Sequence, residues 1–151
     1  MNDKHFKIVV KMLIWKPIAG VFNAFIDPSI ASNFWFSKSS GPLEAGKTVT
    51  WEWETQNISA RINVEEIIEN KLIRFDWGDP IPKVEIEFKA YGDQETLVII
   101  RNYSEKLTGG GVLTEIIEST SNLTSVLDGL KAYMEHNIKL NLIGDKFIQN
   151  N

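Results

Sequence analysis

Apolar and polar residues alternate along several short stretches of the chain, and this spacing predicts β-strands. The first is residues 6–14, where Phe6, Ile8 and Val10 share one face. Further alternating stretches follow residue 47, with short connections between them. They are residues 48–54, 58–68, 72–77, 84–89 and 97–103. Because parallel strands need long crossovers, strands joined this closely must be antiparallel.

Between the first and second of these stretches, the pattern predicts two short helices. Pro17 suits the first turn of a helix, and apolar residues recur at helical spacing as far as Phe25. Asp27 and Pro28 indicate the start of a second helix, with Asp as the N-cap and Pro at the first helical position. We expect this second helix to end near Asn33.

The last part of the chain carries one long apolar stripe at helical spacing. It consists of Leu113, Ile116, Ile117, Thr120, Leu123, Leu127, Leu130 and Met134. So long a stripe must pack on a broad surface, and the predicted sheet is the only candidate. We therefore expect an α+β fold in which a curved antiparallel sheet of six or seven strands wraps around a long C-terminal helix. Residues 1–151 are expected to form one domain.

Residues 33–53 join an aromatic cluster, a Gly/Pro turn and a strand with alternating Trp residues. With residues 17–25, 71–80 and 128–135, this order resembles the START-like (SRPBCC) superfamily. Within it, the chain is similar to the AHSA-type family, named after the C-terminal domain of the activator of the heat-shock protein 90 ATPase. The resemblance extends over about residues 6–147, and residues 73–80 are especially similar to bacterial members.

This resemblance implies the START-like, Bet v-like helix-grip fold, with a hydrophobic cavity between the sheet and the long helix. The superfamily includes lipid carriers and polyketide cyclases, so the fold alone fixes no function. The family name implies a co-chaperone-like protein-interaction module.

Composition excludes several classes of protein and site. The absence of cysteine rules out disulfides, thiolate zinc sites and cysteine nucleophiles. A net charge of −4 argues against nucleic-acid binding, which usually needs a basic face. No apolar run approaches the roughly 20 residues of a membrane span, and the N-terminal residues show no signal core. We therefore expect a cytoplasmic protein.

Aromatic residues are dense along the chain, and two interpretations remain open. They either form an ordinary core or line a ligand cavity, because ligand pockets are mostly apolar with few polar anchors. The long helix adds apolar and hydroxyl side chains to the second interpretation. The candidate ligand-binding residues are Trp35, Phe36, Trp51, Trp53, Phe75, Trp77, Phe88, Arg101, Tyr103, Thr120, Leu123 and Leu127.

Among the charged residues, Arg101 is the strongest candidate for a polar anchor. It shares strand phase with Leu97 and Tyr103, so it points into the cavity if that face turns inward. The alternative is that Val98 and Ile100 face inward and Arg101 is solvated. The glutamates of residues 52–54 and 85–87 are expected on the outer face of the sheet.

Other candidate groups are weaker. Asp76 and Asp79 are either paired carboxylates for acid–base chemistry or turn formers. His5 and His136 lie in no metal-binding motif, and residues 109–111 lack the context of a phosphate loop. No metal or cofactor is expected.

The favoured function is therefore non-catalytic binding of a small hydrophobic or amphipathic ligand. A co-chaperone-like module that binds a chaperone or another protein is the alternative, and a polyketide-cyclase-like enzyme is the second alternative. The chain is expected to be a monomer or a homodimer.

Overall fold

The computed structural model describes residues 6–77, 83–104 and 112–146. Within them, seven strands form one sheet in the order β1-β7-β6-β5-β4-β3-β2, and all neighbours are antiparallel. The strands are β1 (Phe6–Ile14), β2 (Lys38–Ser39), β3 (Thr48–Trp53), β4 (Ile58–Ile68), β5 (Leu72–Asp76), β6 (Lys83–Ala90) and β7 (Thr96–Ser104). The helices are α1 (Ile18–Ile26), α2 (Pro28–Ala31), α3 (Val112–His136) and α4 (Leu142–Lys146), with a 3-10 turn at Glu54–Gln56.

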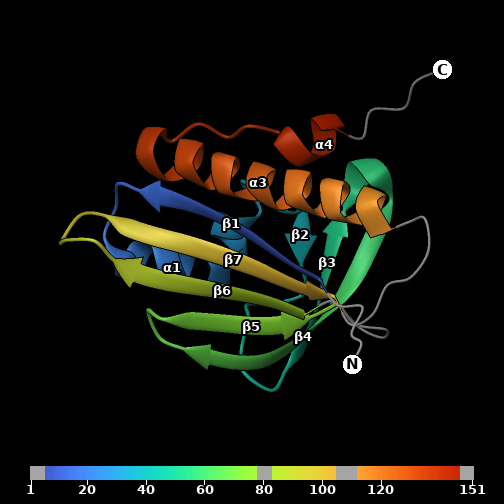
Figure 1. The fold of residues 1–151 in the computed structure, drawn as a ribbon, viewed down its shortest axis with the longest axis horizontal. Coiled ribbons are helices and arrows are strands. Elements are labelled where there is room, and N and C mark those ends of the chain that lie inside the picture. The colour runs from blue at the N-terminus through green and yellow to red at the C-terminus, as the bar shows by residue number, and fades with distance from the viewer. Residues whose placement is uncertain (1–5, 78–82, 105–111, 147–151) are drawn as a thin grey trace.

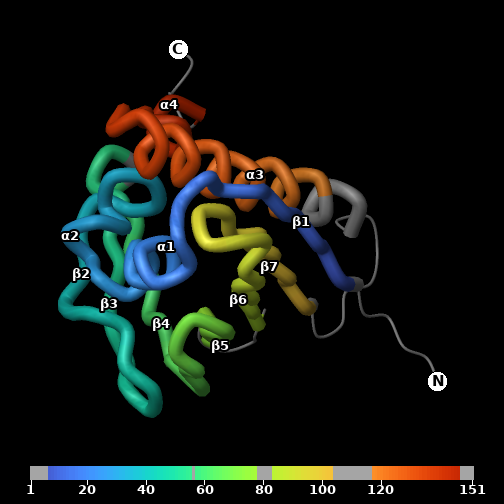
Figure 2. Tube along the Cα trace, turned by 90° about the vertical axis from the view of Figure 1, so that its left-hand side faces the viewer, coloured from blue at the N-terminus to red at the C-terminus, as the bar shows by residue number. Residues whose placement is uncertain are grey.

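The sheet curves into a trough, and α3 lies across its opening. Figure 1 shows α3 running along the upper edge of the sheet, beside β1, with α1 behind β6 and β7. In the end-on view of Figure 2, β1 and β2 lie on opposite sides of the trough, β5 lies near its base and α1 lies near one end. The expected α+β helix-grip fold is confirmed, with seven strands.

Alternation along each strand fills the trough with apolar side chains. Ile62, Ile73, Ile86 and Ile100 come from four neighbouring strands, and all are fully buried. Leu127 and Leu130 of α3 close the core from above, as the predicted helical stripe requires. Glutamates 85 and 87 lie on the outer face, because their neighbours in β6 occupy the inner one.

The two short helices form where their start signals predict. The carboxylate of Asp27 accepts a hydrogen bond from the backbone N–H of Ser29 at 2.9 Å, and Pro28 occupies the first turn of α2. In α1, the buried face includes Val21, Phe22 and Phe25. This face packs into the same core as the sheet.

The structure contains features that the pattern did not predict. β2 is only two residues long, too short to show an alternation. The register of β4 against β5 shifts between Val64 and Glu66, which marks a β-bulge at Glu65. Phe147, Asp79, His5 and residues 109–111 lie outside the described residues.

None of the helices in residues 6–77, 83–104 and 112–146 has the length and apolar character needed to cross a bilayer.

Candidate ligand-binding site

Six aromatic side chains meet inside the trough and form what we call the aromatic cluster. Its members are Trp35, Phe36, Trp51, Trp53, Phe75 and Trp77. Trp51 lies at the centre, because the rings of the five others lie 4.5 to 6.3 Å from its ring, centroid to centroid. Most of these pairs are tilted or edge-to-face, the arrangements that aromatic rings prefer.

Local structure explains why these rings converge. Strand alternation turns Trp51 and Trp53 of β3 to the same face of the sheet. The loop after α2 brings Trp35 to them, and the indole N–H of Trp53 donates a hydrogen bond to the carbonyl of Trp35 at 2.8 Å. The loop itself is fixed by a bond from the backbone N–H of Trp35 to the carbonyl of Ala31 at 2.9 Å.

The exposed fraction of the side chains differs from one side of the aromatic cluster to the other. Trp51 and Phe75 are 1% and 0% exposed, whereas Trp53 and Trp77 are only half-buried. The Trp53 and Trp77 rings lie 6.5 Å apart. The aromatic cluster therefore has a fully packed side and a side that is not fully covered.

The predicted residue Phe88 lies in a second group of rings on the packed side. It contacts Phe22 at 5.3 Å and Phe25 at 5.6 Å, and Phe25 reaches Trp35 at 5.9 Å, centroid to centroid. Phe88 is thus joined to the aromatic cluster through α1 rather than directly.

Helix α3 covers the core with part of the predicted stripe, but Ile117 is 58% exposed, so its place in the stripe was predicted wrongly. Leu123 and Leu127 are buried, and Thr120, one turn earlier than Leu123, is half-buried. The helix also approaches the loop after α2 closely at Gly129. A Cβ atom at this position would lie 3.2 Å from Cβ of Phe34.

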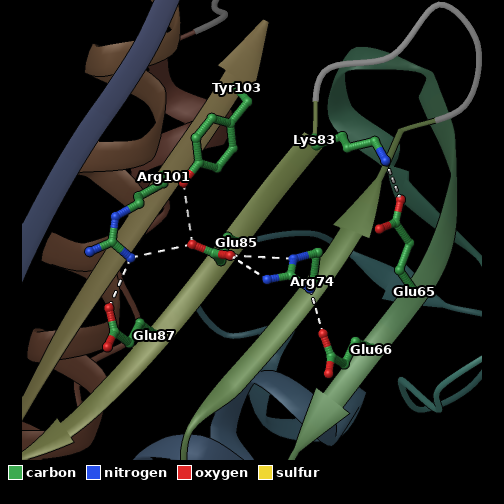
Figure 3. A network of polar contacts seen from close by, with 8 residues as sticks. All are labelled: Glu65, Glu66, Arg74, Lys83, Glu85, Glu87, Arg101 and Tyr103. Carbon is green, nitrogen blue, oxygen red and sulfur yellow. Dashed lines mark hydrogen bonds and ion pairs between the residues drawn. The ribbon is translucent and has the colours of Figure 1, made fainter.

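Arg101 and Tyr103 do not face the space between the sheet and α3, so their prediction as lining of that space is wrong. Val98 and Ile100 point inward and are fully buried, which leaves Arg101 on the outer face. The sequence offered both orientations because each face of β7 carries apolar residues. Figure 3 shows the resulting polar network, with α3 behind the sheet.

Glu85 lies at the centre of this outer network, and its side chain is only 15% exposed. Its carboxylate accepts hydrogen bonds from Arg74 Nη2 at 2.7 Å, Arg101 Nη1 at 3.4 Å and the Tyr103 hydroxyl at 3.4 Å. Arg101 Nη1 also donates to Glu87 at 2.9 Å, and Arg74 pairs with Glu66 (Figure 3).

The network also affects ionisation. The hydrogen bond to Glu87 raises the pKa of Arg101 above its ordinary value despite the opposing effect of burial. Burial, followed by the charge of Glu85, raises the pKa of the Tyr103 hydroxyl. At neutral pH, Arg101 is therefore a cation and Tyr103 an uncharged phenol within the network.

A polar residue that the sequence analysis missed lies on the inner face of β7. Asn102 is 9% exposed, and its Oδ1 atom is buried without a hydrogen-bond partner in the described parts of the chain. The signal was its strand phase, since an Asn two residues after Ile100 interrupts an otherwise apolar face.

Two of the hollows on the described part of the surface lie near the residues discussed above. One, of about 220 Å³, lies beside Trp35 and Trp53 and is also lined by residues 139–144. Its lining is rich in polar side chains, including those of Asn33, Thr55 and Asn141. The other, of about 320 Å³, adjoins the outer network at Arg74, Lys83, Glu85 and Tyr103.

Carboxylates and histidines do not gather into a metal site in the parts of the chain that the structure describes. Among the described residues, no group of three or more His, Cys, Asp or Glu side chains has the arrangement to hold a metal ion. Asp76 accepts a hydrogen bond from Nδ2 of Asn63 at 2.8 Å on the outer face, and His136 lies exposed in the last turn of α3.

Comparison with solved structures gives matches over almost the whole chain. Protein SSP2350 from Staphylococcus saprophyticus is 31% identical, with a TM-score of 0.79 over 90% of this chain and 96% of that one. The Aha1 dimer from Colwellia psychrerythraea is 14% identical, with a TM-score of 0.74 over 87% of this chain and 97% of that one. CalU16 from Micromonospora echinospora is 16% identical, with a TM-score of 0.69 over 93% and 82%.

The second and third of these likenesses support the fold alone. No curated protein gives a significant match. The family described as "Activator of Hsp90 ATPase homolog 1-like protein" matches residues 16–135, most of the chain. The protein therefore belongs to the family of Activator of Hsp90 ATPase homolog 1-like proteins, within the START-like fold group that the sequence resembles.

Proposed function

We propose that this protein binds a small apolar or amphipathic molecule between the sheet and α3, against the aromatic cluster. The observation that carries the proposal is the change of burial across the cluster. Trp53 and Trp77 remain half-buried although they belong to the inner side of the sheet. Large aromatic surfaces of this kind gain free energy when another apolar group covers them.

The proposal assigns different tasks to different parts of the site. Trp77 and Trp53 form a wall for the apolar body of the ligand. Thr120, half-buried on α3 before Leu123, offers a hydroxyl at the helix side of the site. Trp51 and Phe75, which are almost fully covered by protein, support that wall from behind.

Mass spectrometry of an organic extract from the purified protein tests the proposal, with an extract from an empty-vector preparation as the control. We expect a stoichiometric small apolar or amphipathic compound that the control lacks. Trp77→Ala should then weaken binding of that compound by about 2- to 12-fold, since an aromatic contact is worth about 0.5–1.5 kcal/mol.

Trp15→Ala is the matched control, because Trp15 is 58% exposed and lies outside the aromatic cluster. It should leave the affinity unchanged. Equal affinities of the wild-type protein and the Trp77→Ala variant would contradict the proposed place of binding.

A second candidate function is suggested by the family description, which refers to activation of the Hsp90 ATPase. In that case the partner is a chaperone, and the outer surface rather than the aromatic cluster would be used. A clean extract, together with stimulation of a bacterial Hsp90 ATPase by the purified protein, would favour this candidate over ligand binding.

A further inference from the structure

The inner face of β7 carries a polar side chain that needs an explanation. Asn102 follows Val98 and Ile100 on the same face, and both of these are fully buried. Its cross-strand neighbours are Ile8 in β1 and Val84 in β6, which are buried and apolar. The amide thus points into a region that is otherwise lined by aliphatic side chains.

Oδ1 of Asn102 accepts no hydrogen bond from the described residues, although it is buried. A buried acceptor without a donor is unfavourable, because it has lost its hydrogen bonds to water and gained none. Leu is similar in size and would avoid this cost. A hydrogen-bond donor from a bound molecule would remove this cost.

The other buried polar groups of the sheet have partners. Thr96, also on β7, donates to the carbonyl of Lys16 at 2.8 Å. Asp76, on the outer face, accepts from the half-buried Asn63 at 2.8 Å, and Asn63 also accepts from Thr48 at 2.9 Å. Among the buried polar side chains of the described residues, Asn102 therefore stands apart, because its Oδ1 atom has no hydrogen-bond partner.

Asn102 also lies within reach of the aromatic cluster. It faces Val84 in the register of β6 and β7, and Val84 faces Phe75 in the register of β5 and β6. Neighbouring strands are about 4.8 Å apart, so Asn102 and Phe75 are about 10 Å apart on the same face of the sheet. Phe75 lies 5.5 Å from Trp77, ring to ring. The amide and the aromatic cluster therefore lie on the same inner face of the sheet, two strand spacings apart.

We propose that Oδ1 of Asn102 is the polar anchor of the ligand site, and that the ligand is a neutral amphipathic molecule whose O–H or N–H group donates a hydrogen bond to it. This rests on the proposed function. A neutral group fits because the buried polar residues on the inner face are Thr96 and Asn102, neither of them charged. A charged ligand head would be costly to bury there. Phenols, alcohols and amides have the required chemistry.

Three probes of nearly the same shape test the proposal: 1-naphthol, 1-methoxynaphthalene and 1-methylnaphthalene. Their affinities are measured by quenching of tryptophan fluorescence, with protein stripped of extractable compounds. The quantity compared is the affinity for 1-naphthol divided by that for 1-methylnaphthalene. We expect this ratio to fall by about 2- to 12-fold in Asn102→Leu, the range of one neutral hydrogen bond.

Asn63→Leu is the matched control. It removes a partnered amide from the outer face, so it should lower the midpoint of chemical denaturation and leave the affinity ratio unchanged. Asn102→Leu should do the opposite, keeping the denaturation midpoint at or above that of the wild type.

Different failures lead to different conclusions. If 1-methylnaphthalene does not bind to the wild type, the proposed function fails and the anchor fails with it. If it binds but the affinity ratio is the same in Asn102→Leu, only the anchor is overturned. A fall in the affinity for 1-methoxynaphthalene as large as that for 1-naphthol would overturn the donor chemistry. A denaturation midpoint for Asn102→Leu below that of Asn63→Leu would show that Asn102 is structural.

Discussion

Single hydrogen bonds decide how the aromatic side chains are held. The ring of Trp53 packs in the aromatic cluster, while its indole N–H bonds the carbonyl of Trp35 at 2.8 Å. This bond joins β3 to the loop after α2, two segments that no β-ladder connects at this point. Trp53 is therefore both part of the proposed ligand wall and a tie between segments.

Trp53→Phe should lower the free energy of unfolding by about 1–2 kcal/mol, because the carbonyl of Trp35 loses its donor and the smaller ring fills less space. Trp15→Phe is the control, since Trp15 is largely exposed. It should change the free energy of unfolding by less than about 0.5 kcal/mol. Chemical denaturation of both variants measures the difference, and equal effects would show that the indole bond contributes nothing.

At the level of single residues, the sequence predicted the aromatic cluster better than the orientation of the polar residues Arg101 and Tyr103. Trp51 and Trp53 are two positions apart, so alternation alone placed them together. In β7, alternation gave two sets of residues but not the face that each occupies, because Leu97 and Ile99 are as apolar as Val98 and Ile100. The choice depends on packing against α3, which strand spacing does not contain.

Elements far apart in the sequence are joined where β1 ends beneath α3. Nζ of Lys131 donates to the carbonyl of Leu13 at 2.7 Å and to Glu135 at 2.7 Å. Glu135 also accepts from the backbone N–H of Trp15 at 2.8 Å. Burial alone would raise the pKa of Glu135, but the hydrogen bonds from Lys131 and Trp15 outweigh it, so the pKa lies below its ordinary 4.5.

This shift makes the stabilisation by Glu135 dependent on pH. Because the folded pKa is lower than the unfolded one, the stabilisation is complete above about pH 4.5 and is lost as the pH falls through the folded pKa. Glu135→Gln should lower the free energy of unfolding by about 0.5–2 kcal/mol at pH 7. The difference from the wild type should shrink on acidification.

Denaturation between pH 7 and pH 3 measures this difference. Glu118→Gln is the control, because Glu118 is an exposed carboxylate on the same helix. Its difference from the wild type should stay small and constant. A constant deficit for Glu135→Gln over the whole range would contradict the ionic origin of the contact.

The contact between α3 and the loop after α2 depends on a missing side chain. A Cβ atom at Gly129 would lie 3.2 Å from Cβ of Phe34, which is attached directly to the backbone and has little freedom to move. Gly129→Ala should therefore lower the free energy of unfolding by about 1–3 kcal/mol.

Gly20→Ala provides the contrast, since Gly20 is also helical and its Cβ would lie 3.9 Å from the flexible end of Met134. It should raise the free energy of unfolding by about 0.5–1 kcal/mol through helix propensity. Thermal denaturation of both variants measures these changes in the free energy of unfolding. A gain for Gly129→Ala as large as that for Gly20→Ala would show that the loop yields easily.

At the scale of the whole molecule, the order and spacing of elements predicted the fold well. Alternating strands with short connections required an antiparallel sheet, and a single long apolar stripe required a helix packed on it. Neither argument predicts β2, because two residues are too few to show an alternation of apolar and polar positions. Neither predicts the bulge at Glu65, which depends on the pairing of β4 with β5. The proposed ligand site depends on such details of curvature, which strand spacing does not contain.

The sheet order also constrains when the protein can finish folding. From β3 to β7, each strand pairs with the one made just before it, so these pairs can form as the ribosome delivers them. β1 is different, because its partner in the sheet is β7, and α3, which packs beside it, follows later still. During synthesis, β1 therefore remains an unpaired apolar strand until almost all of the other strands of the sheet have been made. That interval, rather than the finished molecule, is when this chain is most exposed to wrong partners.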